Sequence, residues 1–140
     1  MTKVIVSKQI DVSASIAWNK LVSFKGIEEF SPIESSKTVG EGEGATRTCY
    51  LPDGAAIHEV LSKVNQDKME MEYKITDGPF PIDNYISTVK VESVESDQCE
   101  ITWSCEFEVS SEAKDEMEKL FEGFYHVIIE SLETLINSQN

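Results

Sequence analysis

The last stretch of the chain, "SSEAKDEMEKLFEGFYHVIIESLETLINSQN" (residues 110–140), decides the fold class. Its apolar residues recur at intervals of three and four, which is the spacing of one face of an α-helix. Serines precede it and acidic residues fill its first turn, and both favour a helix start. A helix over residues 112–137 would be ~39 Å long, about the width of a small domain. The predicted apolar stripe consists of Ala113, Met117, Leu120, Phe121, Phe124, Ile128, Leu132 and Leu135.

The segments before this helix alternate apolar and polar residues, as strands with one wet face do. The clearest is "CEITWSCEFEV" (99–109), and "MEMEYKIT" (69–76) and "YISTVKVES" (85–93) follow the same pattern. The apolar face of such a sheet needs a cover, and only the C-terminal helix is long enough to supply it. The predicted inward residues include Met71, Tyr73, Tyr85 and Trp103.

The N-terminal part predicts one more strand and two short helices. "KVIVSKQIDVS" (3–13) alternates, Ser13 can cap a helix through about Phe24, and Gly26 supplies a helix stop. "IEEF" (27–30) favours a further helical turn. We therefore expect an α+β helix-grip fold, in which a curved antiparallel sheet of about seven strands wraps around the long C-terminal helix. No repeat or linker divides the chain, so residues 1–140 are expected to form one domain.

Charge and composition narrow the classes of partner. The chain has 12 Lys and Arg against 26 Asp and Glu, a net charge of -14, so nucleic acid and anionic membranes would repel it. No apolar run has the length of a membrane span, and we expect a cytoplasmic protein. Three scattered cysteines and two isolated histidines have no metal-ligand spacing, and we expect neither a metal nor a cofactor. The edge strands of the open sheet could pair with those of a second copy, so a homodimer is compatible with the sequence.

The glycine-rich stretch "GEGEGATRTCYLPDG" (40–54) is not a phosphate loop, because its glycines have the wrong spacing and alternate with glutamates. Its second half is informative instead. "LPDGA" (51–55) is typical of a three-residue hairpin loop, which fixes the register of the flanking strands. If Leu51 pairs with Ala55, Arg47 lies opposite Glu59.

The apolar residues of this hairpin share a face with Arg47 and Glu59, so both charges are predicted to point inward. With a turn at "NQD" (65–67), Glu59 would also face Tyr73 on the next strand. Burying an ion pair removes both charges from water, and this desolvation cost can exceed the attraction between them. Two interpretations stay open: a pair that only specifies register or lies at the wet rim, and a ligand site.

The order of the elements resembles the helix-grip plan of the START-like, or SRPBCC, superfamily over the whole chain. "GATRTCYLPDG", "IHEVL", "DGPFPIDNYISTV" and "ITWSCEFE" resemble its polyketide cyclase/dehydrase and lipid-transport branch. The resemblance implies a cavity between sheet and helix that holds a small hydrophobic molecule. It also implies entry through "DGPFPIDN" (77–84), with Phe80 and Ile82 as a gate.

The hairpin also resembles plant lachrymatory-factor synthases, which rearrange a sulfenic acid with a pocket arginine and glutamate. Arg47 and Glu59 match those two positions, although the hairpin here is shorter. A related branch, the plant abscisic-acid receptors, binds its ligand without turnover, so fold does not decide between catalysis and binding.

Two functions follow from these predictions. In the first, the protein is a carrier or sensor of a small hydrophobic molecule, with Arg47 as an anchor for a ligand oxygen. In the second, it is a cyclase, dehydratase or isomerase, in which Glu59 is the acid or base while Arg47 and Tyr73 stabilise oxyanion charge. The predicted ligand-binding residues are Arg47, Glu59, Met71, Tyr73, Tyr85, Trp103, Met117, Phe121, Phe124 and Ile128.

Overall fold

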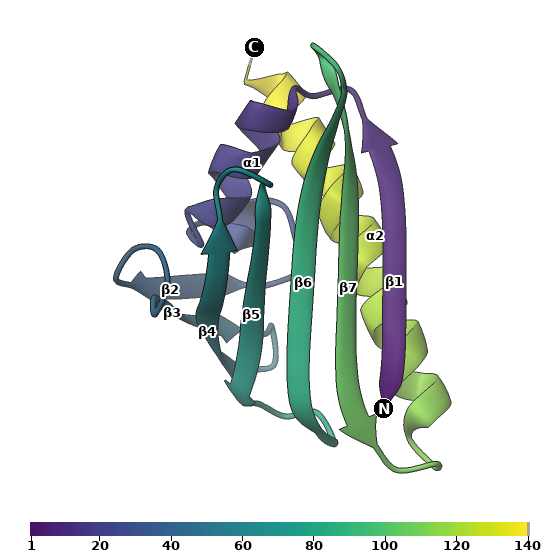
Figure 1. The fold of residues 1–140 in the computed structure, drawn as a ribbon. Coiled ribbons are helices and arrows are strands. Elements are labelled where there is room, and N and C mark those ends of the chain that lie inside the picture. Colours follow the sequence, from purple (N-terminus) through teal and green to yellow (C-terminus); the bar gives the residue numbers. More distant parts are fainter. Residues whose placement is uncertain (140) are drawn as a thin grey trace.

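The computed structural model describes residues 1–139, which form one seven-stranded antiparallel sheet and a long C-terminal helix (Figure 1). The sheet order is β1-β7-β6-β5-β4-β3-β2. None of the helices within residues 1–139 is long and apolar enough to cross a membrane. The elements are β1 (Thr2–Ile10), α1 (Ala14–Val22), the single 3-10 turn η1 (Ile27–Glu29), β2 (Ser35–Val39), β3 (Thr46–Tyr50), β4 (Ala56–Asn65), β5 (Glu70–Asp77), β6 (Ile82–Glu95), β7 (Gln98–Val109) and α2 (Lys114–Ser138).

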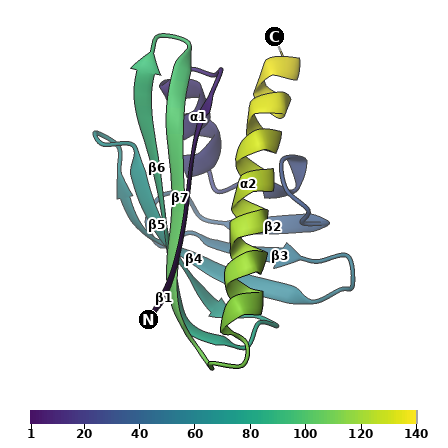
Figure 2. The same ribbon diagram turned by 90° about the vertical axis from the view of Figure 1, so that its right-hand side faces the viewer.

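The sheet curves around α2, as the sequence predicts. Figure 2 shows α2 along one face of the sheet, with β2 and β3 extending behind the helix. The contacts of α2 are concentrated on β1, with fewer on β7. The helix therefore covers one side of the concave face and leaves the face of β3, β4 and β5 to other segments.

Strand alternation predicted the buried face of the sheet correctly. The inward residues of β6 and β7, among them Tyr85 and Trp103, are almost fully buried. The buried face of α2 is rotated relative to the prediction, because the helix turns toward β1 and β7. Leu120 is 42% exposed, and Leu135 is only partly buried. The buried residues of α2 are Met117, Phe121, Tyr125, Ile128, Ile129, Leu132 and Ile136.

Two helix ends differ from the prediction. Ser13 caps α1 as expected, but the helix ends at Val22, and Phe24 (φ 63°) already has left-handed backbone before Gly26. The predicted serine cap of α2 is wrong: the N-cap is Ala113, without a side-chain hydrogen bond. The Ser110 hydroxyl instead accepts a bond from the Ala113 amide (3.4 Å) in the turn before the helix.

The hairpin between β3 and β4 has the predicted register. The Leu51 amide donates to the Ala55 carbonyl (2.9 Å), and Arg47 lies opposite Glu59. The predicted pairing of Glu59 with Tyr73 is wrong. The turn spans residues 66–69 and not 65–67, so Asn65 pairs with Glu70, Leu61 lies opposite Tyr73, and Glu59 lies opposite Ile75. The exact position of a turn without a turn-type signature is not evident from alternation.

The hairpin loop provides a test of this register. Gly54 has φ 89°, and a Cβ atom there would meet no atom within 4 Å, so a Gly54→Ala substitution costs backbone strain alone. We expect it to lower the free energy of unfolding by about 1 kcal/mol, and Gly54→Asn by less, because asparagine tolerates left-handed backbone. Urea unfolding measures both. Equal stability of Gly54→Ala and the parent protein would contradict the described turn.

Candidate functional site

A cavity of about 550 Å³ lies between the concave face of the sheet and the N-terminal half of α2. Strands β3 to β6 supply one wall, the segment around η1 supplies a second, and residues 119–127 of α2 supply the third. Aliphatic and aromatic side chains dominate the lining. The cavity opens beside the exposed side chains of Leu120 and Val127.

The geometry of α2 explains why this space is hollow. The helix leans on β1 and β7, so its opposite side has no strand directly beneath it. Gly123 lines the cavity, and a Cβ atom at that position would have nothing within 4 Å. The absence of a side chain at this helical turn adds to the open volume.

The predicted ion pair lies at the cavity wall. Arg47 Nε donates to Glu59 Oε1 over 2.7 Å, and the two residues are 4% and 8% exposed. Burial by itself lowers the pKa of the Arg47 guanidinium, but the Glu59 carboxylate more than offsets this, and the pKa is raised overall. Arg47 therefore stays protonated, and the pair is an ion pair in the interior of the protein.

Two aromatic rings flank the guanidinium of Arg47. Its carbon lies 3.8 Å from the ring centroid of Phe24 and 5.3 Å from that of Tyr73. Such contacts stabilise a cation, most strongly away from water. The Nη2 atom of Arg47 is buried and has no hydrogen-bond partner within residues 1–139. Arg47 is thus fixed by Glu59 and by stacking, and not by a full set of hydrogen bonds.

Phe24 is a positioning residue that the sequence did not reveal. Its left-handed backbone is unfavourable for a bulky residue by about 1 kcal/mol. The Thr38 hydroxyl donates to the Phe24 carbonyl (2.6 Å), and the Phe24 amide donates to the Leu21 carbonyl (3.2 Å). These bonds hold the ring over Arg47. An aromatic residue shortly before a glycine at a helix end carries no signal for this contact.

Glu59 lines the cavity, whereas Arg47 does not. Oε1 of Glu59 accepts from Arg47 Nε and from the Cys49 thiol (3.4 Å), and no residue within 1–139 donates to Oε2. This order corrects the expectation that Arg47 anchors a ligand directly. Arg47 lies behind Glu59 and positions its carboxylate.

Two weakly acidic groups of the cavity wall stay protonated. Burial, followed by the Glu59 carboxylate, raises the pKa of the Cys49 thiol to about 12 and that of the Tyr73 hydroxyl to about 12. Trp103 Nε1 donates to the Tyr73 hydroxyl (3.1 Å). Tyr73 is therefore held by the core as well as lining the cavity, and its ring, not its hydroxyl, faces Arg47.

The other predicted site residues fall into two groups. Tyr85, Phe121 and Phe124 line the cavity with Glu59 and Tyr73. The remaining four are buried in the packed core and are not cavity-lining residues. These four residues are Met71, Trp103, Met117 and Ile128.

Several lining residues were missed as ligand contacts. Leu51 and Ile57 were predicted to point inward, and their position beside Arg47 and Glu59 was the available signal. Ile27 and Ile33 lie on the irregular segment around η1, where no periodicity predicts direction. Lys119 lines the mouth of the cavity from an exposed position of α2.

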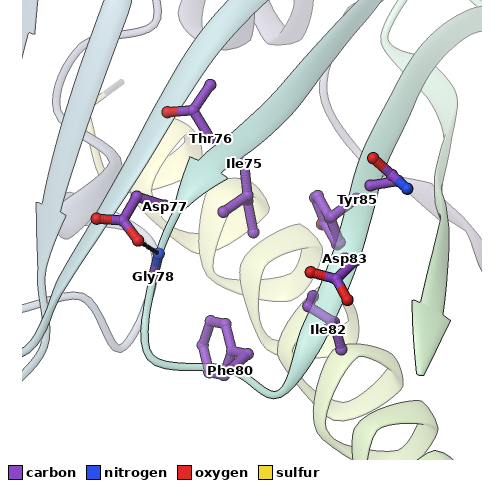
Figure 3. A pocket seen from close by; sticks show the side chains of 9 residues that line it. Ile75, Thr76, Asp77, Gly78, Phe80, Ile82, Asp83 and Tyr85 are labelled. Carbon is purple, nitrogen blue, oxygen red and sulfur yellow. Dashed lines mark hydrogen bonds between the residues drawn. The ribbon is translucent and has the colours of Figure 1, made fainter. Parts of the chain in front are cut away.

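The loop predicted to be a gate lies beside a gap between β5 and β6. The two strands pair as far as Lys74 and Ile86 and then separate around a hollow of about 320 Å³ (Figure 3). Phe80 lines both this hollow and the main cavity, and its ring packs on Phe121 with centroids 5.6 Å apart. Ile82 lines the hollow but not the main cavity.

Within residues 1–139, no cluster of His, Cys, Asp and Glu could hold a metal ion.

The comparisons with known structures agree with this architecture. The protein XoxI of Bacillus cereus is 30% identical, over 96% of this chain and 95% of its own, with a TM-score of 0.86. A protein of Bacillus thuringiensis is 29% identical, over 96% of this chain and 98% of its own, with a TM-score of 0.85.

A more distant structure shares the fold alone. Norcoclaurine synthase of Thalictrum flavum, solved with dopamine and hydroxybenzaldehyde, is 16% identical, over 99% of this chain and 88% of its own, with a TM-score of 0.81. No curated protein sequence matches the chain.

A family profile for polyketide cyclase/dehydrase and lipid transport matches residues 1–137. The match covers every strand, both helices and the cavity described above. The chain therefore belongs to the polyketide cyclase/dehydrase and lipid transport family, within the SRPBCC superfamily.

Proposed function

We propose that this protein binds a small hydrophobic molecule in the cavity between the sheet and α2, as a carrier or sensor. The apolar cavity of about 550 Å³ supports the proposal most directly, because its volume lies within the range of small-molecule sites. An apolar wall with one carboxylate, that of Glu59, has the composition such sites share: hydrophobic surface for affinity and few polar groups for orientation.

The position of Phe80 supports a second route of entry, between β5 and β6, besides the mouth beside Leu120 and Val127. Phe80 is part of the wall of the main cavity and of the hollow in this gap, and the loop that carries it lies outside the paired strands. Rotation of the Phe80 ring away from Phe121 would connect the two spaces. Ile82 lies at the outer side of this route.

An acid/base enzyme is the second candidate, and the environment of Glu59 favours it. A carboxylate oxygen without a protein donor lies at the wall of an apolar cavity, where a general acid or base acts. Arg47 would hold the Glu59 carboxylate in place, and Tyr73 would contact the substrate. Incubation of the protein with the compound identified from a co-purified ligand, followed by liquid chromatography with mass spectrometry, separates the candidates: a carrier leaves the compound unchanged, whereas this enzyme would convert it to an isomer with a different retention time or to a dehydrated product of lower mass.

Adding bulk at the opening of the cavity should weaken or remove binding without loss of the fold. Gly123 is an exposed residue at the open side of the cavity, and a Leu side chain there would add bulk at this opening, so we expect Gly123→Leu to weaken or remove binding of the fluorescent probe N-phenylnaphthylamine. Gly123→Ala is the matched control, and it should retain binding while raising the free energy of unfolding by about 0.5–1 kcal/mol. Full probe binding by a folded Gly123→Leu protein would contradict the proposed site.

Removing the Phe80 ring should speed ligand exchange. We expect Phe80→Ala to raise both the association and the dissociation rate of the same probe several-fold, with a smaller change in affinity, because the ring blocks the route more than it contacts the ligand. Stopped-flow fluorescence measures both rates. Ile5→Ala, at an exposed site on β1, is the control and should leave them unchanged. Unchanged rates in Phe80→Ala would exclude this route.

Substitutions of Arg47 and Glu59 distinguish an ion pair that takes part in ligand binding from one that only supports the fold. Arg47→Met alone leaves the Glu59 carboxylate buried without its partner, and should lower the free energy of unfolding by about 3–5 kcal/mol. Arg47→Met combined with Glu59→Leu should return stability to near the parent value or above it. Urea unfolding measures both variants. A stable double variant that binds and selects ligands as the parent does would show that the pair serves folding alone.

A further inference from the structure

We propose that the ligand carries an uncharged hydrogen-bond donor, a hydroxyl or an amide N–H, and donates it to Oε2 of Glu59. This inference rests on the proposed binding function and specifies the chemical class of the ligand. It differs from a site for fatty acids or other carboxylates, which an arginine in a pocket would suggest.

The two oxygens of Glu59 have different surroundings. Oε1 is occupied, because Arg47 Nε (2.7 Å) and the Cys49 thiol (3.4 Å) both donate to it. Oε2 has no protein donor within residues 1–139. It is also not fully buried, because Arg47 Nη2 is the one side-chain N or O atom in that part of the chain that is both buried and unpartnered. Oε2 is therefore an acceptor that a molecule in the cavity can reach.

The arrangement of Arg47 disfavours a carboxylate ligand. Arg47 does not line the cavity, the Phe24 ring covers its guanidinium, and its Nη2 atom is buried without a partner. Its Nη1 atom has no partner within residues 1–139 either, but it belongs to a residue outside the cavity wall. An anion in the cavity would meet the carboxylate of Glu59 before it met Arg47. The cation that does line the cavity, Lys119, is exposed at its mouth, where solvent screens its charge.

A charged donor is disfavoured as well. The ion pair of Arg47 and Glu59 is neutral as a unit, so an ammonium group in the cavity would be a third charge without a partner of its own. The tyrosine hydroxyls of the wall already have partners: Tyr73 accepts from Trp103, and Tyr85 bonds to Tyr125. An uncharged donor facing Oε2 satisfies the one open acceptor of Glu59 without adding charge.

Four probes of one shape test the inference: naphthylmethanol, its methyl ether, methylnaphthalene and naphthoate, all substituted at the same ring position. They share the apolar ring and differ in carrying a donor, an acceptor, no polar group or a negative charge. By isothermal titration calorimetry we expect naphthylmethanol to bind about tenfold more tightly than methylnaphthalene, the factor a hydrogen bond to a charged group supplies. The ether and naphthoate should bind no better than methylnaphthalene.

Variants locate the effect at Glu59. Glu59→Gln should reduce the preference for the alcohol, and the Arg47→Met, Glu59→Leu double variant should abolish it while still binding methylnaphthalene. Glu92→Gln removes a glutamate from the exposed part of β6 and should leave the preference unchanged. Lys119→Gln tests whether the lysine at the mouth of the cavity attracts anions. We expect the affinity for naphthoate to stay low in this variant.

The outcomes distinguish the two proposals. If methylnaphthalene and the alcohol bind equally well, or the ether matches the alcohol, the donor inference is wrong and the binding function stands. If naphthoate binds most tightly and Lys119→Gln does not weaken it, the cavity is an anion site and the inference is also wrong. If none of the four probes binds, the binding function fails and the donor inference fails with it.

Discussion

One long helix has to cover the concave face of seven strands, and this constraint shapes the rest of the molecule. α2 packs on β1 and β7, which neighbour each other in the sheet although they are far apart in sequence. The inward residues of β3, β4 and β5 are then left without a helix over them. The segment around η1 closes that side only in part, and the cavity is the space that remains.

Several unfavourable features meet at the wall of this space. An ion pair is buried there, one buried nitrogen of Arg47 has no partner within residues 1–139, and Phe24 adopts a backbone conformation that bulky residues avoid. An apolar pair at positions 47 and 59 would pack without the first two of these costs. Local strain and buried charge are expected at functional sites more than elsewhere, and here they are concentrated around the carboxylate of Glu59.

Sequence reasoning succeeded where periodicity or turn chemistry fixes geometry. The three-residue loop at Pro52 predicted that Arg47 opposes Glu59, and alternation predicted the buried face of β6 and β7. It failed where geometry depends on irregular backbone: the turn between β4 and β5 spans residues 66–69 and not 65–67, so Tyr73 pairs with Leu61, and Phe24 ended α1 early. Alternation also gives the face of a residue but not its distance from a cavity, so Met71 and Trp103 were assigned to the site although they belong to the core.

The glycine on the cavity side of α2 has a consequence for how this protein can change over time. Backbone hydrogen bonds hold the helix and the strands, so the side chain at position 123 can change how far that turn of the helix intrudes into the hollow without changing either. Replacement by alanine, valine or leucine would shorten the pocket in small steps while the scaffold stays intact. The size of the cavity is thus adjustable in evolution at a single codon, independently of the carboxylate of Glu59 at its wall.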